Sequence, residues 1–173
     1  DGALHCWGRS GFGKTEVPSG VGAWSSVSAG YFHTCGVAQA DGVLHCWGYD
    51  EYDQTTVPSG MGAWSSVSAG YFHTCGVAQA DGAIHCWGSN DDGQADAPSG
   101  VGAWSSVSTG MYHTCGIAQA DGAMRCWGSP SDYDDYGQAD VPSDVSAWSS
   151  VSAGWYHTCG IAQATGALRC WGW

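Results

Sequence analysis

Histidine and cysteine residues recur at fixed spacing in this chain of 173 residues, and both types can bind metals or take part in catalysis. The stretch 31–48 brings together His33, Cys35, His45 and Cys46. Imidazole and thiolate are standard zinc ligands, and a cysteine beside a histidine can also be a nucleophile beside its base. Two of the four could instead form a structural disulfide. The elements that carry these residues must therefore be identified before the chemistry can be assigned.

The stretch 31–48 is typical of a β-hairpin. Two runs of β-branched, aromatic and apolar residues flank Ala40-Asp41-Gly42, and an Asp-Gly pair between such runs predicts a turn because Gly tolerates positive φ. If Ala40 and Asp41 form the loop, residue 39 pairs with 42, residue 38 with 43, and Cys35 with Cys46. The two cysteines then lie within disulfide distance.

Strand geometry excludes a four-ligand zinc site. Residues 33 and 35 share one face of a strand, whereas 45 and 46 point to opposite faces, so the four side chains cannot converge on one ion. Arg125 and Arg169 also replace the second histidine in later copies of the hairpin. A Cys–His dyad repeated in every copy makes no sense as a single active site. We therefore predict structural disulfides, no catalysis and no cofactor.

The hairpin recurs along the whole chain, as the step from His33 to His73 to His113 and then to His157 shows. The predicted organisation is one array over 1–173, with a partial repeat over 1–8 and repeats at about 9–48, 49–88, 89–128 and 129–173. Each repeat also contains a strand such as Trp24 to Ala29, and a fourth strand is expected around Gln94 to Ala97. Near-identical units of this length predict a solenoid or propeller-like array.

The repeated pattern Ala-Gly-x-x-His-Thr-Cys-x-x-Ala-x-x-x-Gly-x-x-x-Cys-Trp-Gly resembles the RCC1-type repeat, the β-propeller family named after the regulator of chromosome condensation. It is closest to the cysteine-containing version found in secreted proteins. The resemblance implies an all-β fold of tandem blades, as a closed propeller or an open array, each blade with a disulfide-stapled hairpin. The repeats are shorter than is usual in the family and too few for its usual ring. We therefore expect a segment of a longer array, or else a ring in which residues 1–8 lie beside the last blade.

Eight of the nine cysteines form evenly spaced pairs, which indicates an oxidising compartment and a secreted, extracellular protein. The predicted disulfides join Cys35 to Cys46, Cys75 to Cys86, Cys115 to Cys126 and Cys159 to Cys170. Cys6 occupies the position of the second cysteine of each pair, and its partner is missing from the chain. We expect Cys6 to be unpaired or joined to a sequence outside this chain.

The charge balance is acidic, with four Lys or Arg against sixteen Asp or Glu and a net charge of −12. A nucleic-acid-binding protein needs a basic surface to displace counterions from phosphates, so nucleic acid is not an expected partner. Anionic membranes are excluded for the same reason. No apolar run is long enough to insert into a bilayer.

The loops after each Trp-Gly pair differ most between repeats and are expected to lie on one rim. The loop tyrosines are the candidate ligand contacts: Tyr49, Tyr52, Tyr133 and Tyr136. The loop aspartates are the candidates for a Ca²⁺ site: Asp91, Asp92, Asp132, Asp134 and Asp135. Neither acidic stretch follows a full calcium-loop template, so we favour a solvated acidic rim and expect no metal.

Two sets of repeated residues are expected to have structural roles. The tryptophans Trp7, Trp47, Trp87, Trp127 and Trp171 hold fixed repeat positions and are predicted to lie in the core. The histidines His33, His73, His113 and His157 are predicted to hydrogen-bond to backbone between strands.

These features predict a non-catalytic extracellular structural or assembly protein that associates with itself end to end, as part of a fibre or surface array. The alternative is a secreted ligand-binding propeller that holds a protein or a glycan through its variable rim. The exchange-factor role of the nuclear members of the family is disfavoured by the acidity and by the cysteine pairs.

Overall fold

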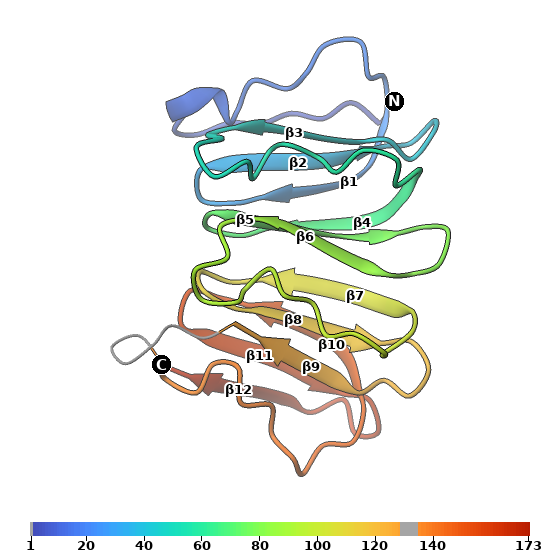
Figure 1. Cartoon of the computed structure of the whole chain (residues 1–173), viewed down its shortest axis with the longest axis vertical. Coiled ribbons are helices and arrows are strands. Elements are labelled where there is room, and N and C mark those ends of the chain that lie inside the picture. The colour runs from blue at the N-terminus through green and yellow to red at the C-terminus, as the bar shows by residue number, and fades with distance from the viewer. Residues whose placement is uncertain (1, 129–134) are drawn as a thin grey trace.

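A computed structural model describes residues 2–128 and 135–173 of the chain. The described residues form twelve strands and one 3₁₀ turn, η1 (Gly11–Gly13), and the strands make four antiparallel three-stranded sheets (Figure 1). We call the sheets blades 1 to 4. They consist of β1 (Trp24–Ala29), β2 (His33–Ala38) and β3 (Leu44–Gly48); β4 (Trp64–Ala69), β5 (His73–Ala78) and β6 (Ile84–Gly88); β7 (Trp104–Thr109), β8 (Thr114–Ala118) and β9 (Met124–Trp127); and β10 (Trp148–Ala153), β11 (His157–Ala162) and β12 (Leu168–Gly172).

The hairpin register is as predicted, but the turn is longer. Cys35 lies opposite Cys46, and the Ala38 N–H donates to the Val43 carbonyl at 2.8 Å. The Gly42 N–H bonds to the Ala38 carbonyl at 3.0 Å, so residue 39 does not pair with residue 42. The loop therefore runs over residues 39–42, and Gly42 takes the positive φ of 72° that closes it.

Four disulfides staple the hairpins, and all four predicted pairs are confirmed. They join Cys35 to Cys46, Cys75 to Cys86, Cys115 to Cys126 and Cys159 to Cys170, each with a Cα–Cα distance of 4.1 Å. Among the described residues, Cys6 is the cysteine left free. Burial raises the pKa of its thiol.

The first strand of each blade begins at a tryptophan whose ring lies over the middle strand. A β-bulge between Trp24 and Ser26 turns the Trp24 ring onto Gly36, where a Cβ would come within 2.6 Å of the ring. The predicted strand from Trp24 to Ala29 is confirmed. A fourth strand near Gln94 is not formed among the described residues, because the loop bonds to itself: the Ala95 N–H donates to the Asn90 Oδ1 at 2.8 Å.

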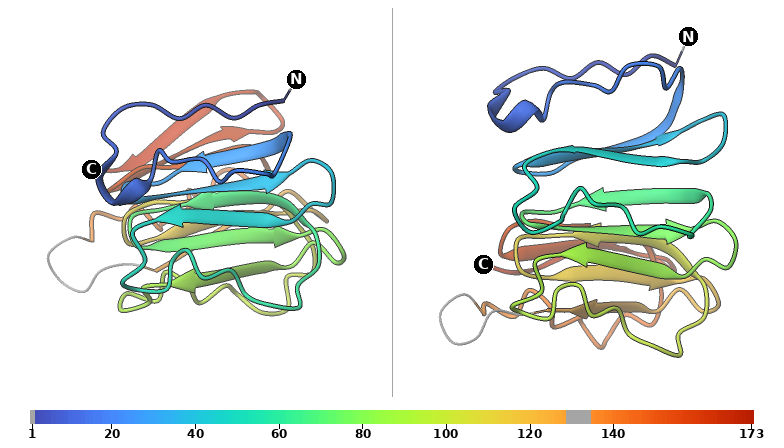
Figure 2. Two further views of the ribbon diagram at one scale, coloured as in Figure 1. Left: turned by 90° about the horizontal axis from the view of Figure 1, so that it is seen from above. Right: turned by 45° about the horizontal axis from the view of Figure 1, so that its top comes forward.

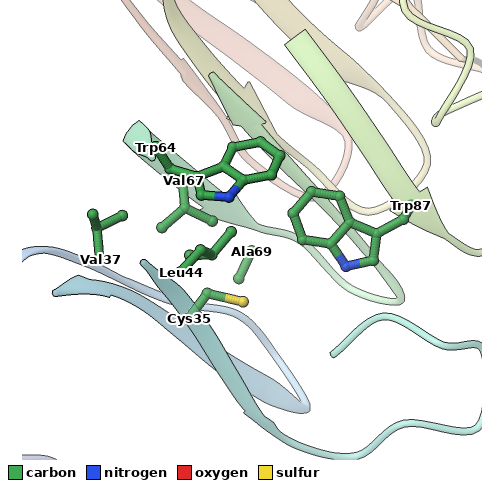
Figure 3. Packing of buried hydrophobic residues seen from close by; sticks show 7 residues of the cluster. All are labelled: Cys35, Val37, Leu44, Trp64, Val67, Ala69 and Trp87. Atoms are coloured by element: carbon green, nitrogen blue, oxygen red, sulfur yellow. The ribbon is translucent and has the colours of Figure 1, made fainter. Parts of the chain in front are cut away.

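The hydrophobic core lies between successive blades rather than within one. Figure 3 shows Val37 and Leu44 of blade 1 packed against Trp64 and Val67 of blade 2. Equivalent clusters lie between blades 2 and 3 and between blades 3 and 4. Because each blade buries its apolar face against the next, the blades form one array.

The array is open, and the expectation of a ring closed by residues 1–8 is wrong. The first residues lie over the outer side of blade 1 (Figures 1 and 2), where the Gly2 carbonyl accepts a bond from the Trp24 N–H at 3.0 Å. The equivalent bond inside the array joins Gly42 to Trp64 at 2.8 Å. Residues 2–8 thus lie where the third strand of a preceding blade would lie.

Candidate functional site

The joint between successive blades is the most strongly repeated polar arrangement in the molecule. The Nε2 of His33 in blade 1 lies 2.7 Å from the Oγ1 of Thr74 in blade 2. His73 and Thr114 repeat this contact at 2.9 Å. His113 and Thr158 repeat it again at 2.8 Å. The predicted bonds from these histidines to backbone are therefore wrong, because each Nε2 reaches a side chain of the next blade.

The threonine fixes the tautomer of the histidine. Thr74 Oγ1 has one hydrogen, which it donates to the Gln54 carbonyl at 2.7 Å. Nε2 of His33 must therefore be the donor in its bond to Thr74, which leaves Nδ1 without a hydrogen. The indole N–H of Trp87 donates to the same Gln54 carbonyl at 3.0 Å. One joint thus links two blades and the loop between them through a single chain of hydrogen bonds.

Two further features tie the blades together at each joint. The Oγ of Ser28 accepts from the Ala69 N–H of the next blade at 2.9 Å, and Ser68 and Ser108 repeat this contact at 3.0 and 2.9 Å. A Cβ at Gly30 would come within 2.6 Å of the Gly70 carbonyl oxygen. A side chain at residue 30 would therefore push the two backbones apart.

Burial keeps the joint histidines neutral. It lowers the pKa of His33 and of His113 to about 4, and the pKa of His73 to about 3. The neighbouring His33 and His113 lower the pKa of His73 further, whereas Asp50 partly opposes the shift at His33. Protonating any of these rings would place a charge in a buried, water-poor joint.

Each of the two end blades carries one half of this joint, and no other blade of the described chain packs against that half. Blade 4 exposes His157 and Ser152. On blade 1, Thr34 is 5% exposed and its Oγ1 donates to the Lys14 carbonyl at 2.9 Å, but no described histidine reaches it. Val27 beside it is 49% exposed, whereas its counterpart Val67 is 8% exposed. These two half-joints carry complementary donors and acceptors.

Residues 2–8 partly cover the half-joint of blade 1. Cys6 and Leu4 face Val27 and Thr34 across a groove of about 410 Å³. Trp7 is 86% exposed, so its predicted core position is wrong, whereas Trp87 and Trp127 are buried at 9% exposure each. Trp47 and Trp171 are half-buried. The tryptophan position is therefore buried in blades 2 and 3, each of which has a neighbouring blade on both sides.

A second candidate site is an aromatic surface at one end of the strands. In blades 1 and 2 the turn after the first strand and the loop after the third strand meet at this end, because the strands are antiparallel. Tyr49 and Tyr52, two of the predicted contacts, lie here in contact with Phe72. Tyr136 lies on the same face of blade 4 and stacks on Trp173. Tyr133 lies outside the described residues.

Sequence reasoning missed most of this surface. Tyr31 contacts Tyr71 and Trp155, with centroid distances of 4.8 and 5.3 Å. These three residues line one pocket, which brings together turns of blades 1, 2 and 4 although blades 1 and 4 are far apart in sequence. Paired aromatics such as Tyr31-Phe32, in a turn where polar residues are usual, were the available signal.

The candidate calcium loops show no assembled metal site. Asn90 donates to Asp96 at 2.9 Å, and the Asp92 N–H donates to Gln94 at 2.9 Å, so this loop is held by its own bonds. Asp135 accepts from the Gly137 N–H at 3.0 Å. Within the described ranges no three His, Cys, Asp or Glu side chains gather as metal ligands would, at Asp91 or elsewhere. Asp132 and Asp134 lie outside those ranges.

Comparison with known structures finds RCC1-like propellers. The entire ectodomain of the receptor kinase CR4 from Physcomitrella patens is 30% identical, with a TM-score of 0.79 over 98% of this chain and 46% of that chain. The CRINKLY WD40 ectodomain of the receptor kinase ACR4 from Arabidopsis thaliana is 25% identical, with a TM-score of 0.66 over 86% of this chain and 50% of that chain. Prp20p from Saccharomyces cerevisiae is 17% identical, with a TM-score of 0.69 over 87% of this chain and 45% of that chain, and shows the fold alone.

The chain thus spans about half the length of these proteins. Comparison with curated proteins finds no significant match. None of the helices in the described part of the chain is long and apolar enough to cross a membrane. The sequence-family model of the regulator of chromosome condensation (RCC1) repeat matches residues 24–54, 64–94 and 148–173, which together make up more than half of the chain. The chain belongs to the RCC1 repeat family.

Proposed function

We propose that this chain is a non-catalytic extracellular assembly module whose two end blades join copies head to tail. The observation that carries this proposal is the His–Thr joint, which forms three times inside the chain and is left as two complementary halves at its ends. In the joined state, His157 of one copy donates to Thr34 of the next, and Ser152 accepts from the Ala29 N–H. A contact between two different surfaces of this kind propagates into a filament or closes into a ring.

Residues 2–8 compete with this contact, because they occupy the place that β12 of an incoming copy needs. They form no strand, whereas β12 pairs with β11 over five residue pairs and is held by the Cys159–Cys170 disulfide. The incoming blade is therefore the better-held occupant, and residues 2–8 are displaced. Displacement releases the Cys6 thiol and the already exposed Trp7 into solvent.

The extracellular part of the proposal rests on two observations. Four disulfides in a chain of this length are typical of an oxidising compartment. Two structural neighbours, at 30% and 25% identity, are ectodomains of receptor kinases. The non-catalytic part rests on the use of the histidines and paired cysteines in joints and staples.

Sedimentation velocity over a range of protein concentrations tests the proposal. We expect the protein to associate increasingly as its concentration rises. The double variant His157→Ala with Ser152→Ala, which changes two exposed residues, should associate more weakly. The matched control is Thr165→Ala, an exposed change in the turn at the opposite end of the same blade. Removal of residues 1–8 should strengthen association. A monomer at every concentration, with and without residues 1–8, would contradict the proposal.

A second candidate function is the binding of a ligand by the aromatic surface. The observation that favours it is the continuous contact of aromatic rings from blades 1, 2 and 4 at one end of the strands. Trp155 and Tyr31 are 50% and 44% exposed there. Loss of ligand binding on Trp155→Ala, with unchanged self-association, would separate this function from assembly.

A further inference from the structure

The aromatic rings on blades 1 and 2 form one connected patch, which we call the aromatic patch: Phe12, Phe32, Tyr49, Tyr52 and Phe72. Phe32 and Phe72 stack with centroids 5.1 Å apart and planes at 4°. Tyr52 lies 4.8 Å from Phe72, and Phe12 lies 4.9 Å from Tyr49. The rings come from η1, from two interstrand turns and from the loop after β3, so the folded array alone brings them together.

The patch is open at its edges. Phe12 is 63% exposed and Tyr52 is 43% exposed. Phe32, Tyr49 and Phe72 are half-buried among them. A contiguous exposed aromatic surface rimmed by polar residues often marks the site where a partner or ligand binds.

A cation already occupies part of this surface. The ammonium of Lys14 lies 5.7 Å from the Tyr31 centroid and 6.0 Å from the Phe32 centroid, and it donates to the Tyr31 carbonyl at 2.7 Å. These distances lie within the range of cation–π attraction. Lys14 is thus an internal example of a positive charge placed over these rings.

One carboxylate contacts the patch, and a second lies close to it in sequence. The loop after β3 carries Glu51 and Asp53 on either side of Tyr52 in sequence. Glu51 accepts a hydrogen bond from the Tyr49 hydroxyl, which holds one carboxylate at the edge of a patch ring. Asp53 is exposed. Asp50 is less available, because it accepts from the Thr55 N–H at 2.7 Å and from the Thr56 hydroxyl.

We propose that the aromatic patch, with Glu51 and Asp53, binds arginine or lysine side chains of a basic segment of a partner protein. This inference rests on the second candidate function and names its ligand. The cationic group lies over the exposed ring of Tyr52, next to Phe72, and is neutralised by the two carboxylates. The net charge of −12 draws such a segment toward the chain.

The loop between β6 and β7 gives an internal contrast. It also carries two carboxylates, Asp91 at the repeat position of Glu51 and Asp92 at that of Tyr52, yet residues 89–94 contain no aromatic side chain. Attraction by charge alone should use both loops equally. Binding through the patch should depend on the loop that has both carboxylates and rings.

Titration calorimetry with an end-blocked tetra-arginine peptide tests the proposal at physiological ionic strength, with tetraglutamine as the neutral peptide and a neutral oligosaccharide as the glycan probe. We expect tetra-arginine to bind and tetraglutamine not to bind. Tyr52→Ala and Tyr52→Leu should each weaken binding roughly three- to thirty-fold, because leucine keeps the apolar bulk without the aromatic face. Circular dichroism melting confirms that both variants fold.

The control variants remove equal charge from the two loops. Glu51→Gln with Asp53→Asn should weaken binding more than Asp91→Asn with Asp92→Asn. Equal loss from both pairs, or no loss in the Tyr52 variants, would overturn the proposal in favour of unspecific attraction. Binding of the oligosaccharide without binding of tetra-arginine would overturn it and leave the second candidate function standing. Binding of no probe would count against both.

Discussion

The joint between blades 2 and 3 and the uncovered side of blade 4 have the same His-Thr-Cys sequence but opposite surroundings. His73 is fully buried and bonded to Thr114, whereas His157 is exposed. The hairpin around each is stapled in the same way. The sequence motif therefore determines the blade, but the neighbouring blade determines whether the histidine holds the array together. The disulfide-stapled hairpin is therefore a property of a single repeat, whereas the His–Thr bond is a property of two neighbouring repeats.

Acid should break the inner joints first, and this is the largest effect we expect. Burial lowers the pKa of His33, His73 and His113 to about 4, 3 and 4, from an ordinary value of 6.5. Between these values the unfolded chain binds more protons than the folded one, so the free energy of unfolding falls as pH falls from 6.5 toward 4. Melting temperatures measured across this range should decrease steadily.

His73→Gln sharpens the acid prediction, because it removes one titrating ring from an inner joint. The variant should be less stable at neutral pH and should lose less on acidification than the wild type. A melting temperature that stays constant or rises from pH 6.5 to 4.5 would contradict the neutral-histidine description.

Removing a disulfide should be the next largest effect, and it should depend on the blade. Each bridge closes the same short loop, with a sequence separation of 11, so the loss of chain entropy alone predicts about 3 kcal/mol in every blade. The double variant Cys75→Ser with Cys86→Ser also places a hydroxyl where Cys75 is fully buried. Cys159→Ser with Cys170→Ser acts at a more exposed site. Denaturant unfolding should show a larger loss for the first pair, and equal losses would show that the neighbouring blade contributes nothing.

The hairpin and its disulfides could be predicted because their determinants are local. The Asp-Gly turn fixes the register from residue 38 to residue 43, and the cysteine spacing then requires Cys35 to face Cys46. The turn length was the part in error, because Gln39 bonds to Ala23 at 2.9 Å, a contact with another strand segment that the hairpin sequence does not reveal.

The joints and the aromatic patch could not be predicted because their contacts join different repeats. His33 and Thr74 are 41 residues apart, and no local pattern pairs a histidine with a threonine at that distance. The exposure of Trp7 has the same cause, since the tryptophan position is buried only in blades 2 and 3, which have a neighbouring blade on both sides. The rim tyrosines stand out in sequence because their loops vary, whereas Phe32 and Phe72 lie in near-identical turns that carry no such signal.

Histidine replacement compares the covered and uncovered joints directly. His73→Ala leaves a cavity and leaves the Thr114 hydroxyl without its donor, so we expect a loss of about 2 to 4 kcal/mol. His157→Ala removes an exposed ring and should change the free energy of unfolding by less than about 0.5 kcal/mol. Denaturant titration of dilute protein measures both. A large loss for His157→Ala under dilute conditions would mean that the ring has a role within its own blade.

Valine replacement is the smallest contrast and the one that best separates stability from assembly. Val67 is 8% exposed between blades 1 and 2, so Val67→Ala should lower the free energy of unfolding by about 1 to 2 kcal/mol through lost burial and a small cavity. Val27 is its counterpart on the uncovered side of blade 1 and is 49% exposed, so Val27→Ala should cost about 0.5 kcal/mol or less in dilute solution.

If copies join head to tail, the Val27 side chain becomes buried on association, and its replacement should weaken association while leaving the dilute protein nearly as stable. Sedimentation and unfolding measured on the same two variants then give opposite rankings, because Val67 is already covered by its own chain and Val27 is covered only by the next copy. The same ranking in both measurements would remove the support that the uncovered blade gives to assembly.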